Sequence, residues 1–150
     1  MNMIAETPLP TRPVDDEPAR MIRARLAEAR RLALRGEPER ARLLCAESVL
    51  GWLPWICRDA ELLQYAIATL FMARGFELLR RLLAAAQGRR VRFAAVPADA
   101  PSPRPKGIAE VGLGDGTTLF RFADDLLDHP ARERVVTSWS QQLVAPQAAA

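Results

Sequence analysis

Between residues 17 and 88, apolar residues recur at helical spacing, and four glycines interrupt the pattern. In the first interval Ile22, Leu26, Ala29 and Ala33 share one face of a helix with 3.6 residues per turn. Glycine lacks a Cβ and readily ends a helix, so each interruption indicates a turn. The pattern predicts helices from near Asp16 to Gly36, from Pro38 to Gly51, from Asp59 to Gly75, and from Phe76 to Gln87 before Gly88. The short turns at Gly36 and Gly75 pair these helices into two antiparallel hairpins.

The character of the chain changes after residue 88. Residues 91–96 alternate weakly and suit a strand, while residues 97–105 hold four prolines and suit an extended loop. The runs 108–113 and 117–122 flank Gly-Asp-Gly, a strong signal for a β-hairpin. A closing helical segment is expected over 123–144. The sequence therefore predicts an α+β fold, predominantly α: two helical hairpins, a small β-hairpin and a C-terminal helix.

One domain is expected over residues 17–144, because a domain commonly takes 100–200 residues. Its parts are a helical region (17–88), strands with the proline-rich loop (89–122) and the closing helix. Residues 1–16 carry three prolines and no apolar period, so they are expected to form a flexible, mildly acidic arm. Residues 145–150 are expected to form a disordered tail.

Several classes of chemistry find no support in the sequence. Cys45 and Cys57 match no redox or zinc spacing and are expected to be buried thiols in a bacterial cytoplasm. His129 is the only histidine, and no nucleophile-elbow or phosphate-loop motif accompanies it. The acidic cluster of Asp124, Asp125 and Asp128 lacks calcium-loop spacing and is expected at the start of the last helix. We therefore expect no enzyme activity, cofactor or metal. No apolar stretch approaches the roughly 20 residues that span a bilayer.

The first hairpin resembles a tetratricopeptide-type repeat over residues 20–54. That family places small residues where its two helices cross, a glycine at the turn and often a proline afterwards. Ala29, Gly36, Ala41, Ser48 and Pro54 take these places here. The aromatic positions hold other residues, the second hairpin has Arg80 where an alanine belongs, and its glycine lies 39 residues on instead of about 34. The resemblance implies peptide or protein binding but transfers no functional residue.

Basic residues gather in the middle of the chain, where residues 20–92 contain 15 arginines and 7 acidic residues. Arginines are most closely spaced at the end of this region, where the candidate nucleic-acid contacts are Arg80, Arg81, Arg89, Arg90 and Arg92. In a winged-helix DNA-binding regulator, residues 76–87 would be the recognition helix and 112–118 the wing. That helix offers few groups that read bases. The alternative explanation is a solvated basic face.

A second candidate surface is apolar. Trp52 and Trp55 lie in an apolar link between the hairpins, where they either seal the junction or anchor a partner. With Phe71 and Phe76, they are the candidate partner-binding residues. The apolar faces of the third and fourth helices are large for so small a body, which suggests a homodimer or a permanent partner. The favoured function is a non-enzymatic, protein-binding adaptor or chaperone-like module that binds its partner in a helical groove. The alternative is the DNA-binding regulator.

Overall fold

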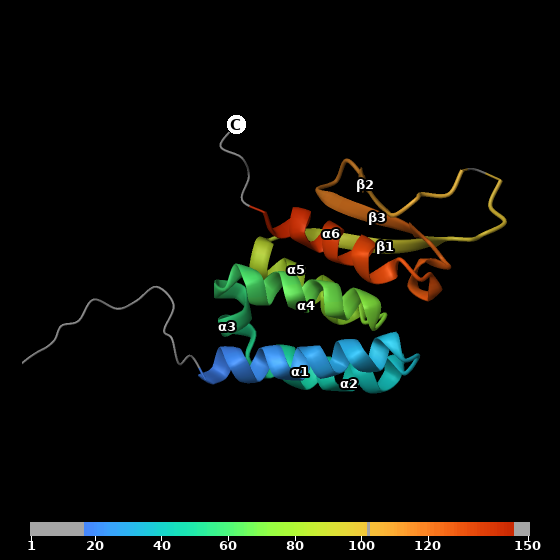
Figure 1. Ribbon diagram of the computed structural model, residues 1–150. Coiled ribbons are helices and arrows are strands. Elements are labelled where there is room, and N and C mark those ends of the chain that lie inside the picture. The colour runs from blue at the N-terminus through green and yellow to red at the C-terminus, as the bar shows by residue number, and fades with distance from the viewer. Residues whose placement is uncertain (1–16, 102, 146–150) are drawn as a thin grey trace, which may run out of the picture.

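The computed structural model describes residues 17–101 and 103–145. Helices fill the first part of this range, and a small sheet with a last helix lies above them (Figure 1). The predominantly helical α+β class predicted from the sequence is confirmed. The predicted arm over residues 1–16 lies outside the described residues, as does the predicted tail apart from Ala145.

The first two helices, α1 (Glu17–Leu34) and α2 (Pro38–Gly51), form the predicted antiparallel hairpin. Gly36 adopts a left-handed φ of 84°, which a residue with a Cβ rarely tolerates. The turn closes when the Glu37 amide donates to the Leu32 carbonyl at 2.9 Å. Pro38 begins α2, where its missing N–H costs no hydrogen bond.

The segment after α2 corrects the prediction of an irregular apolar link. It forms a short helix, α3 (Leu53–Arg58), with Pro54 in its first turn. Ile56 is fully buried, so this helix turns its apolar side into the core. Trp52 is the residue at which α2 ends and α3 begins.

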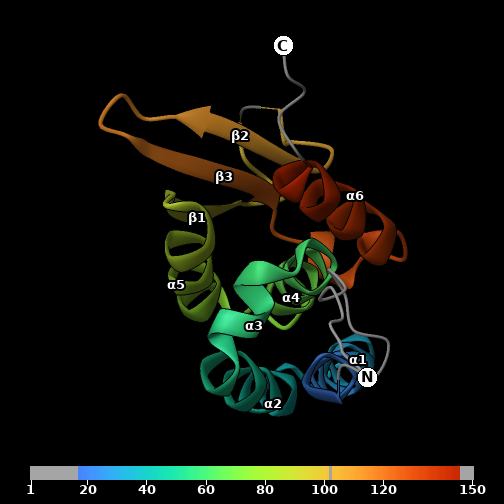
Figure 2. The ribbon, with the colours of Figure 1, turned by 90° about the vertical axis from the view of Figure 1, so that its left-hand side faces the viewer.

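The second hairpin consists of α4 (Ala60–Met72) and α5 (Phe76–Gln87). The Asp59 carboxylate caps α4 by accepting from the amides of Glu61 at 3.0 Å and Leu62 at 3.2 Å. Gly88 ends α5 with φ of 66°. Figure 2 shows α4 in the middle of the molecule, with α1, α2, α3, α5 and α6 around it. The broad apolar face of α4 is thus covered inside the chain. It therefore gives no support to a homodimer, which stays a prediction.

The sheet has three strands, β1 (Arg90–Val96), β2 (Ile108–Gly112) and β3 (Thr117–Ala123). The predicted hairpin of β2 and β3 is present, and β1 pairs in parallel with the other side of β3. The chain leaving β1 must therefore pass the end of β3 to reach β2, about 10 Å away at the usual strand spacing. The proline-rich loop makes this crossing (Figure 1).

The closing segment comprises a 3-10 turn, η1 (Leu126–Asp128), and α6 (Arg132–Val144). The expectation that the aspartates begin the last helix is wrong, because α6 starts at Arg132. Asp124 and Asp125 instead lie 3.8 and 3.2 Å from the Arg104 guanidinium. Asp128 lies 3.3 Å from Arg74, so this pair joins η1 to the turn between α4 and α5.

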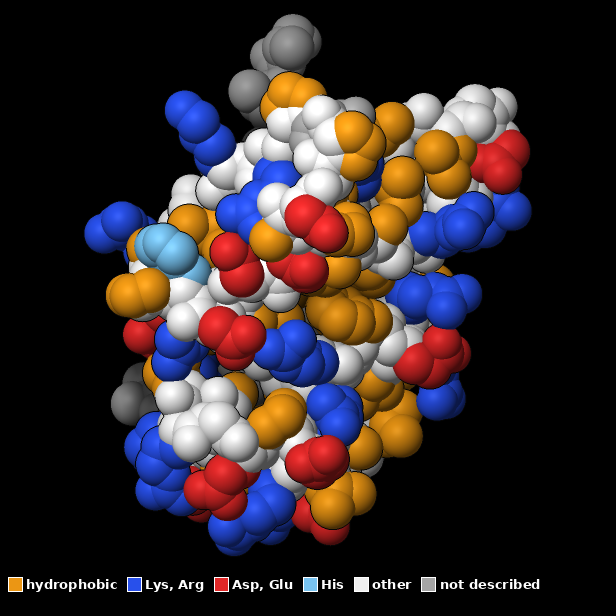
Figure 3. Space-filling view, turned by 90° about the vertical axis from the view of Figure 1, so that its right-hand side faces the viewer, with side chains coloured by type: hydrophobic (Ala, Val, Ile, Leu, Met, Phe, Trp, Pro, Cys, Tyr) orange, Lys and Arg blue, Asp and Glu red, His pale blue; other side chains and the backbone are white. Residues whose placement is uncertain are grey.

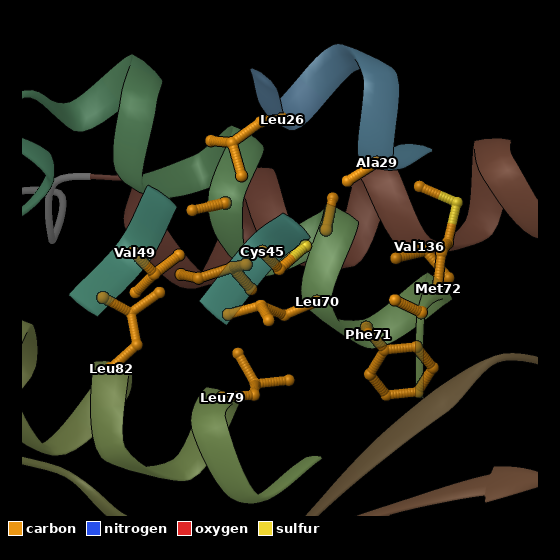
Figure 4. Close-up of a cluster of buried hydrophobic side chains, with 14 of the residues drawn as sticks. Leu26, Ala29, Cys45, Val49, Leu70, Phe71, Met72, Leu79, Leu82 and Val136 are labelled. Atoms are coloured by element: carbon orange, nitrogen blue, oxygen red, sulfur yellow. The ribbon is translucent and has the colours of Figure 1, made fainter. Parts of the chain in front are cut away.

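The core runs without a break from the first hairpin to the sheet (Figure 4). Phe71 is its aromatic centre. Its ring centroid lies 5.0 Å from Phe122, 5.1 Å from Trp139 and 5.3 Å from Phe76. Edge-to-face and tilted ring pairs of this kind add to the free energy of burial. They tie α4 to α5, β3 and α6.

A buried arginine joins three helices. Arg30 of α1 is only 9% exposed, and its guanidinium lies 3.9 Å from the centroid of the Tyr65 ring on α4. It donates to Thr69 Oγ1 and to the Tyr65 carbonyl, and Glu133 of α6 lies 3.8 Å away. Burial lowers the pKa of Arg30, while Tyr65 and Glu133 oppose that shift.

Candidate functional site

An apolar groove lies on the outside of the helical part, between α2 and α5. It has a volume of about 740 Å³. In Figure 2, α5 lies at the left of the view and α2 lies below it. Its apolar walls comprise Leu43, Ala46 and Leu50 of α2, Leu70 of α4, and Phe76 and Leu78 of α5.

The sequence of α2 explains why one wall of this groove is apolar. Ala41, Cys45, Ser48 and Val49 are buried against the other helices. Leu43, Ala46 and Leu50 fall on a different side at steps of three and four, so α2 is apolar on two sides. Leu43 is 70% exposed and Leu50 is 48% exposed. The exposure of two leucines beside one groove makes this the candidate interaction surface.

The rim of the groove is charged. Arg42 donates to the Ala73 carbonyl at 2.9 Å, which holds its side chain across the end of α4. Glu39, Arg74, Glu77 and Arg81 complete the rim, so it carries both signs. At its base, a Cβ on Gly75 would lie 3.2 Å from Leu70 Cδ2. Glycine at this turn therefore permits the close approach of α5 to α4.

The four predicted partner-binding residues lie in different places and differ in burial. Phe71 is fully buried, so its assignment to a surface is wrong: α5, β3 and α6 cover it. Phe76 is half-buried and lines the groove. Trp52 and Trp55 are half-buried against the core at α3, away from the groove walls. The Arg58 guanidinium lies 4.9 Å from the centroid of the Trp55 ring.

Sequence reasoning missed Leu43 and Leu50. A helical repeat alone does not show which of two apolar sides of a helix is covered. The signal was available, since Leu43 and Leu50 do not fit the inner face formed by Ala41, Cys45 and Ser48.

A second surface feature adjoins the groove along α5, where Glu77 and Arg81 line both. All five predicted nucleic-acid contacts line one hollow of about 370 Å³ between α5 and β1: Arg80, Arg81, Arg89, Arg90 and Arg92. Figure 3 shows one face of the surface, on which hydrophobic side chains form a band with basic and acidic groups at its borders. The band runs from the sheet at the top toward the first hairpin at the bottom.

The groups considered for catalysis are not assembled into a site. His129 is exposed, and its Nδ1 accepts from the Ala131 amide at 3.0 Å. Cys45 is buried, and desolvation raises the pKa of its thiol to about 12. Cys57 is only half-buried. In residues 17–101 and 103–145, no three His, Cys, Asp or Glu side chains converge as metal ligands. Nor does that part of the chain contain a helix with the length and apolar character to cross a membrane.

Comparison with known proteins adds no family to this description. No protein-family model, curated protein or solved structure matches the chain.

Proposed function

We propose that this protein is a non-enzymatic adaptor or chaperone-like module, and that its groove between α2 and α5 binds an amphipathic helix of a partner protein. The observation that carries the proposal is the exposure of Leu43 and Leu50 beside a groove whose opposite wall holds Leu78. Exposed leucines cost free energy in water, which a partner would recover by covering them.

The spacing of the apolar side chains favours a helical occupant. Leu43 and Leu50 are seven positions apart on α2, about 10 Å along its axis. A partner helix with apolar residues at i, i+4 and i+7 presents anchors over the same length. Because Leu43 is 70% and Leu50 48% exposed, covering the exposed part would contribute about 1–1.5 kcal/mol for each leucine. The mixed charges of the rim would set the orientation of that helix.

The tetratricopeptide resemblance belongs to the same proposal. Ala29, Ala41 and Ser48 are buried, as close helix packing requires, and Gly36 makes the turn between α1 and α2. The two cysteines are free thiols in the described residues, which is compatible with a reducing bacterial cytoplasm as the place of binding.

A site-specific photo-crosslink tests the groove. The full chain carries p-benzoylphenylalanine at position 43, or at position 113 as the matched control. Leu113 is also exposed, at 38%, but it follows β2 outside the groove. We expect position 43 to crosslink a heterologous chain in cells, through a segment with apolar residues at helical spacing. Position 113 should give no such product.

A second test of the groove introduces negative charge into its apolar wall. The double variant Leu43→Asp/Leu50→Asp should abolish binding of that partner, measured with both purified proteins. Val111→Asp/Leu113→Asp adds the same charge to exposed apolar positions elsewhere and should leave binding unchanged. Equal losses in both variants, or a crosslinked product that is only a second copy of this chain, would contradict the proposal.

A further inference from the structure

The hollow between α5 and β1 collects positive charge from segments that are separate in the sequence. Arg80 and Arg81 project from α5, and Arg89, Arg90 and Arg92 come from the chain that enters and forms β1. Glu77 is the acidic residue of the lining, against five arginines. The guanidinium fork matches the oxygens of a phosphate group, so this lining suits a phosphate-bearing ligand.

Two of these arginines are held in place by carboxylates. Arg80 Nη1 lies 2.9 Å from Glu77 Oε1, one turn earlier on α5. Arg89 Nη2 lies 2.9 Å from Glu110 Oε2 on β2, and its guanidinium lies 5.4 Å from the centroid of the Phe120 ring. These contacts reduce the side-chain entropy that the two arginines would lose on binding.

The β-hairpin turn holds a third arginine. Arg90 Nη2 donates to the Asp115 carbonyl oxygen. A Cβ on Gly116 would lie 3.0 Å from the same Nη2, and Gly116 has a left-handed φ of 88°. Glycine at this position therefore lets the turn approach Arg90.

Arg81 and Arg92 are both exposed. Within residues 17–101 and 103–145, neither guanidinium forms an ion pair or a hydrogen bond. The hollow thus combines three positioned arginines with two whose donors face solvent. Glu77 and Glu110 neutralise two of the five positive charges, so the hollow keeps a positive surplus.

An aromatic hollow of about 520 Å³ adjoins the basic one. Phe76, Phe93 and Phe122 line it, and it shares Arg80, Arg92 and Glu77 with the basic hollow. Phe76 and Phe93 are half-buried, with ring centroids 5.2 Å apart. Partly exposed rings beside guanidinium groups offer a surface on which a nucleobase can stack.

We propose that the two hollows together bind single-stranded nucleic acid, with phosphates among the five arginines and a base against Phe76 and Phe93. This site adjoins the proposed protein-binding groove and shares Phe76, Glu77 and Arg81 with it, whereas Leu43 and Leu50 line the groove alone. A ligand needs both phosphates and accessible flat rings to fill the two hollows. An acidic peptide supplies carboxylates but no regular succession of flat rings. A duplex supplies phosphates, but its paired and stacked bases cannot enter the aromatic hollow.

Fluorescence anisotropy with the full chain tests the site at low salt. The probes are a labelled 12-nucleotide thymidine strand, an abasic strand of the same length, and a duplex. We expect the thymidine strand to bind about tenfold tighter than the abasic strand, as loss of base stacking predicts. Phe93→Leu, which keeps apolar volume but removes the ring, should erase that difference. Circular dichroism confirms that each variant is folded.

Matched arginine variants distinguish binding in the basic hollow from non-specific electrostatic attraction to a basic protein. Arg81→Gln/Arg92→Gln should lower affinity and reduce the slope of log K against log salt by about 1.4, the value for two lost contacts with a single strand. Arg25→Gln/Arg134→Gln removes the same charge from α1 and α6 and should leave both quantities nearly unchanged. Leu43→Asp/Leu50→Asp should also leave them nearly unchanged.

Four results would overturn the proposal. They are absence of binding at low salt, duplex binding at least as tight as single-strand binding, equal competition by polyglutamate, and equal losses in the two arginine variants. The second would favour duplex recognition by α5, and the third would favour an acidic peptide. None of these results bears on the crosslink at position 43, so the two proposals can fail independently.

Discussion

Replacing Phe71 with alanine should lower the free energy of unfolding strongly, although it removes no exposed side chain from either proposed binding surface. Phe71 is completely buried, and four aromatic rings from α5, β1, β3 and α6 lie around it. The contrasting position is Leu43, which is 70% exposed on α2. The two substitutions therefore test directly which apolar residues form the core and which form the surface.

The cost at Phe71 follows from its surroundings. A buried phenylalanine removes roughly 200 Å² from water, worth about 5 kcal/mol at about 25 cal/mol per Å². Measured Phe→Ala substitutions in cores cost about 3–5 kcal/mol, and the lost ring pairs favour the upper part of that range. Phe71→Leu keeps most of the volume and should cost about 1–2 kcal/mol. Leu43→Ala should change the free energy of unfolding by less than about 0.5 kcal/mol.

Urea denaturation followed by circular dichroism measures all three variants. The midpoint should fall strongly for Phe71→Ala, moderately for Phe71→Leu and hardly for Leu43→Ala, with an unchanged m-value. Domains of this size have a total stability of about 5–15 kcal/mol, so Phe71→Ala should remain measurable at low temperature. A cost below about 1 kcal/mol for Phe71→Ala would refute the placement of Phe71 at the centre of the core.

Four further substitutions or treatments probe local features of the fold. A thiol reagent at neutral pH should label Cys57 and spare Cys45 until the protein unfolds, because Cys45 is buried and its pKa is raised to about 12. Mass spectrometry identifies the labelled peptide. Faster labelling of Cys45 than of Cys57 would contradict the packing of α2. Because the pKa of Cys45 is raised in the folded state, this thiol stabilises the protein below its ordinary pKa of 9.0. That contribution is lost as the pH rises from 9 to about 12, so the free energy of unfolding should fall over this range. Cys45→Ala should reduce the fall. Asp59→Ala should cost about 1 kcal/mol in urea denaturation by removing the cap of α4, and no loss would show that the cap is unimportant. Gly88→Ala should cost about 1 kcal/mol because Gly88 has a left-handed φ, whereas a stabilising effect would contradict that conformation.

Local sequence signals located most of the elements. Glycine at 36 and 88, proline at 38 and the Asp59 cap each act within one helical turn, so they fix helix ends without reference to the rest of the chain. The turn between β2 and β3 was predictable for the same reason. The helix at α3 was missed because six residues are too few to show a helical period.

Surface properties were less predictable than the elements that carry them. Phe71 and Leu43 are both apolar residues on helices, and their own helices do not distinguish them. Phe71 is covered by Phe122 and Trp139, which lie more than 50 residues later in the chain. Leu43 is exposed because no described segment packs over that side of α2. Choosing candidate partner-binding residues mainly among the aromatic ones therefore selected the buried Phe71 and passed over the exposed Leu43 and Leu50.

The sequence by itself determined the class of the fold, the ends of most helices and the presence of a basic middle region. Those features follow from backbone preferences and side-chain periodicity, which act over a few residues. The tertiary structure alone decided that β1 pairs in parallel with β3, that α2 and α5 enclose an apolar groove, and that five arginines share one hollow. These arrangements depend on which distant segments bury each other's apolar faces, and that choice is settled only when the whole core packs.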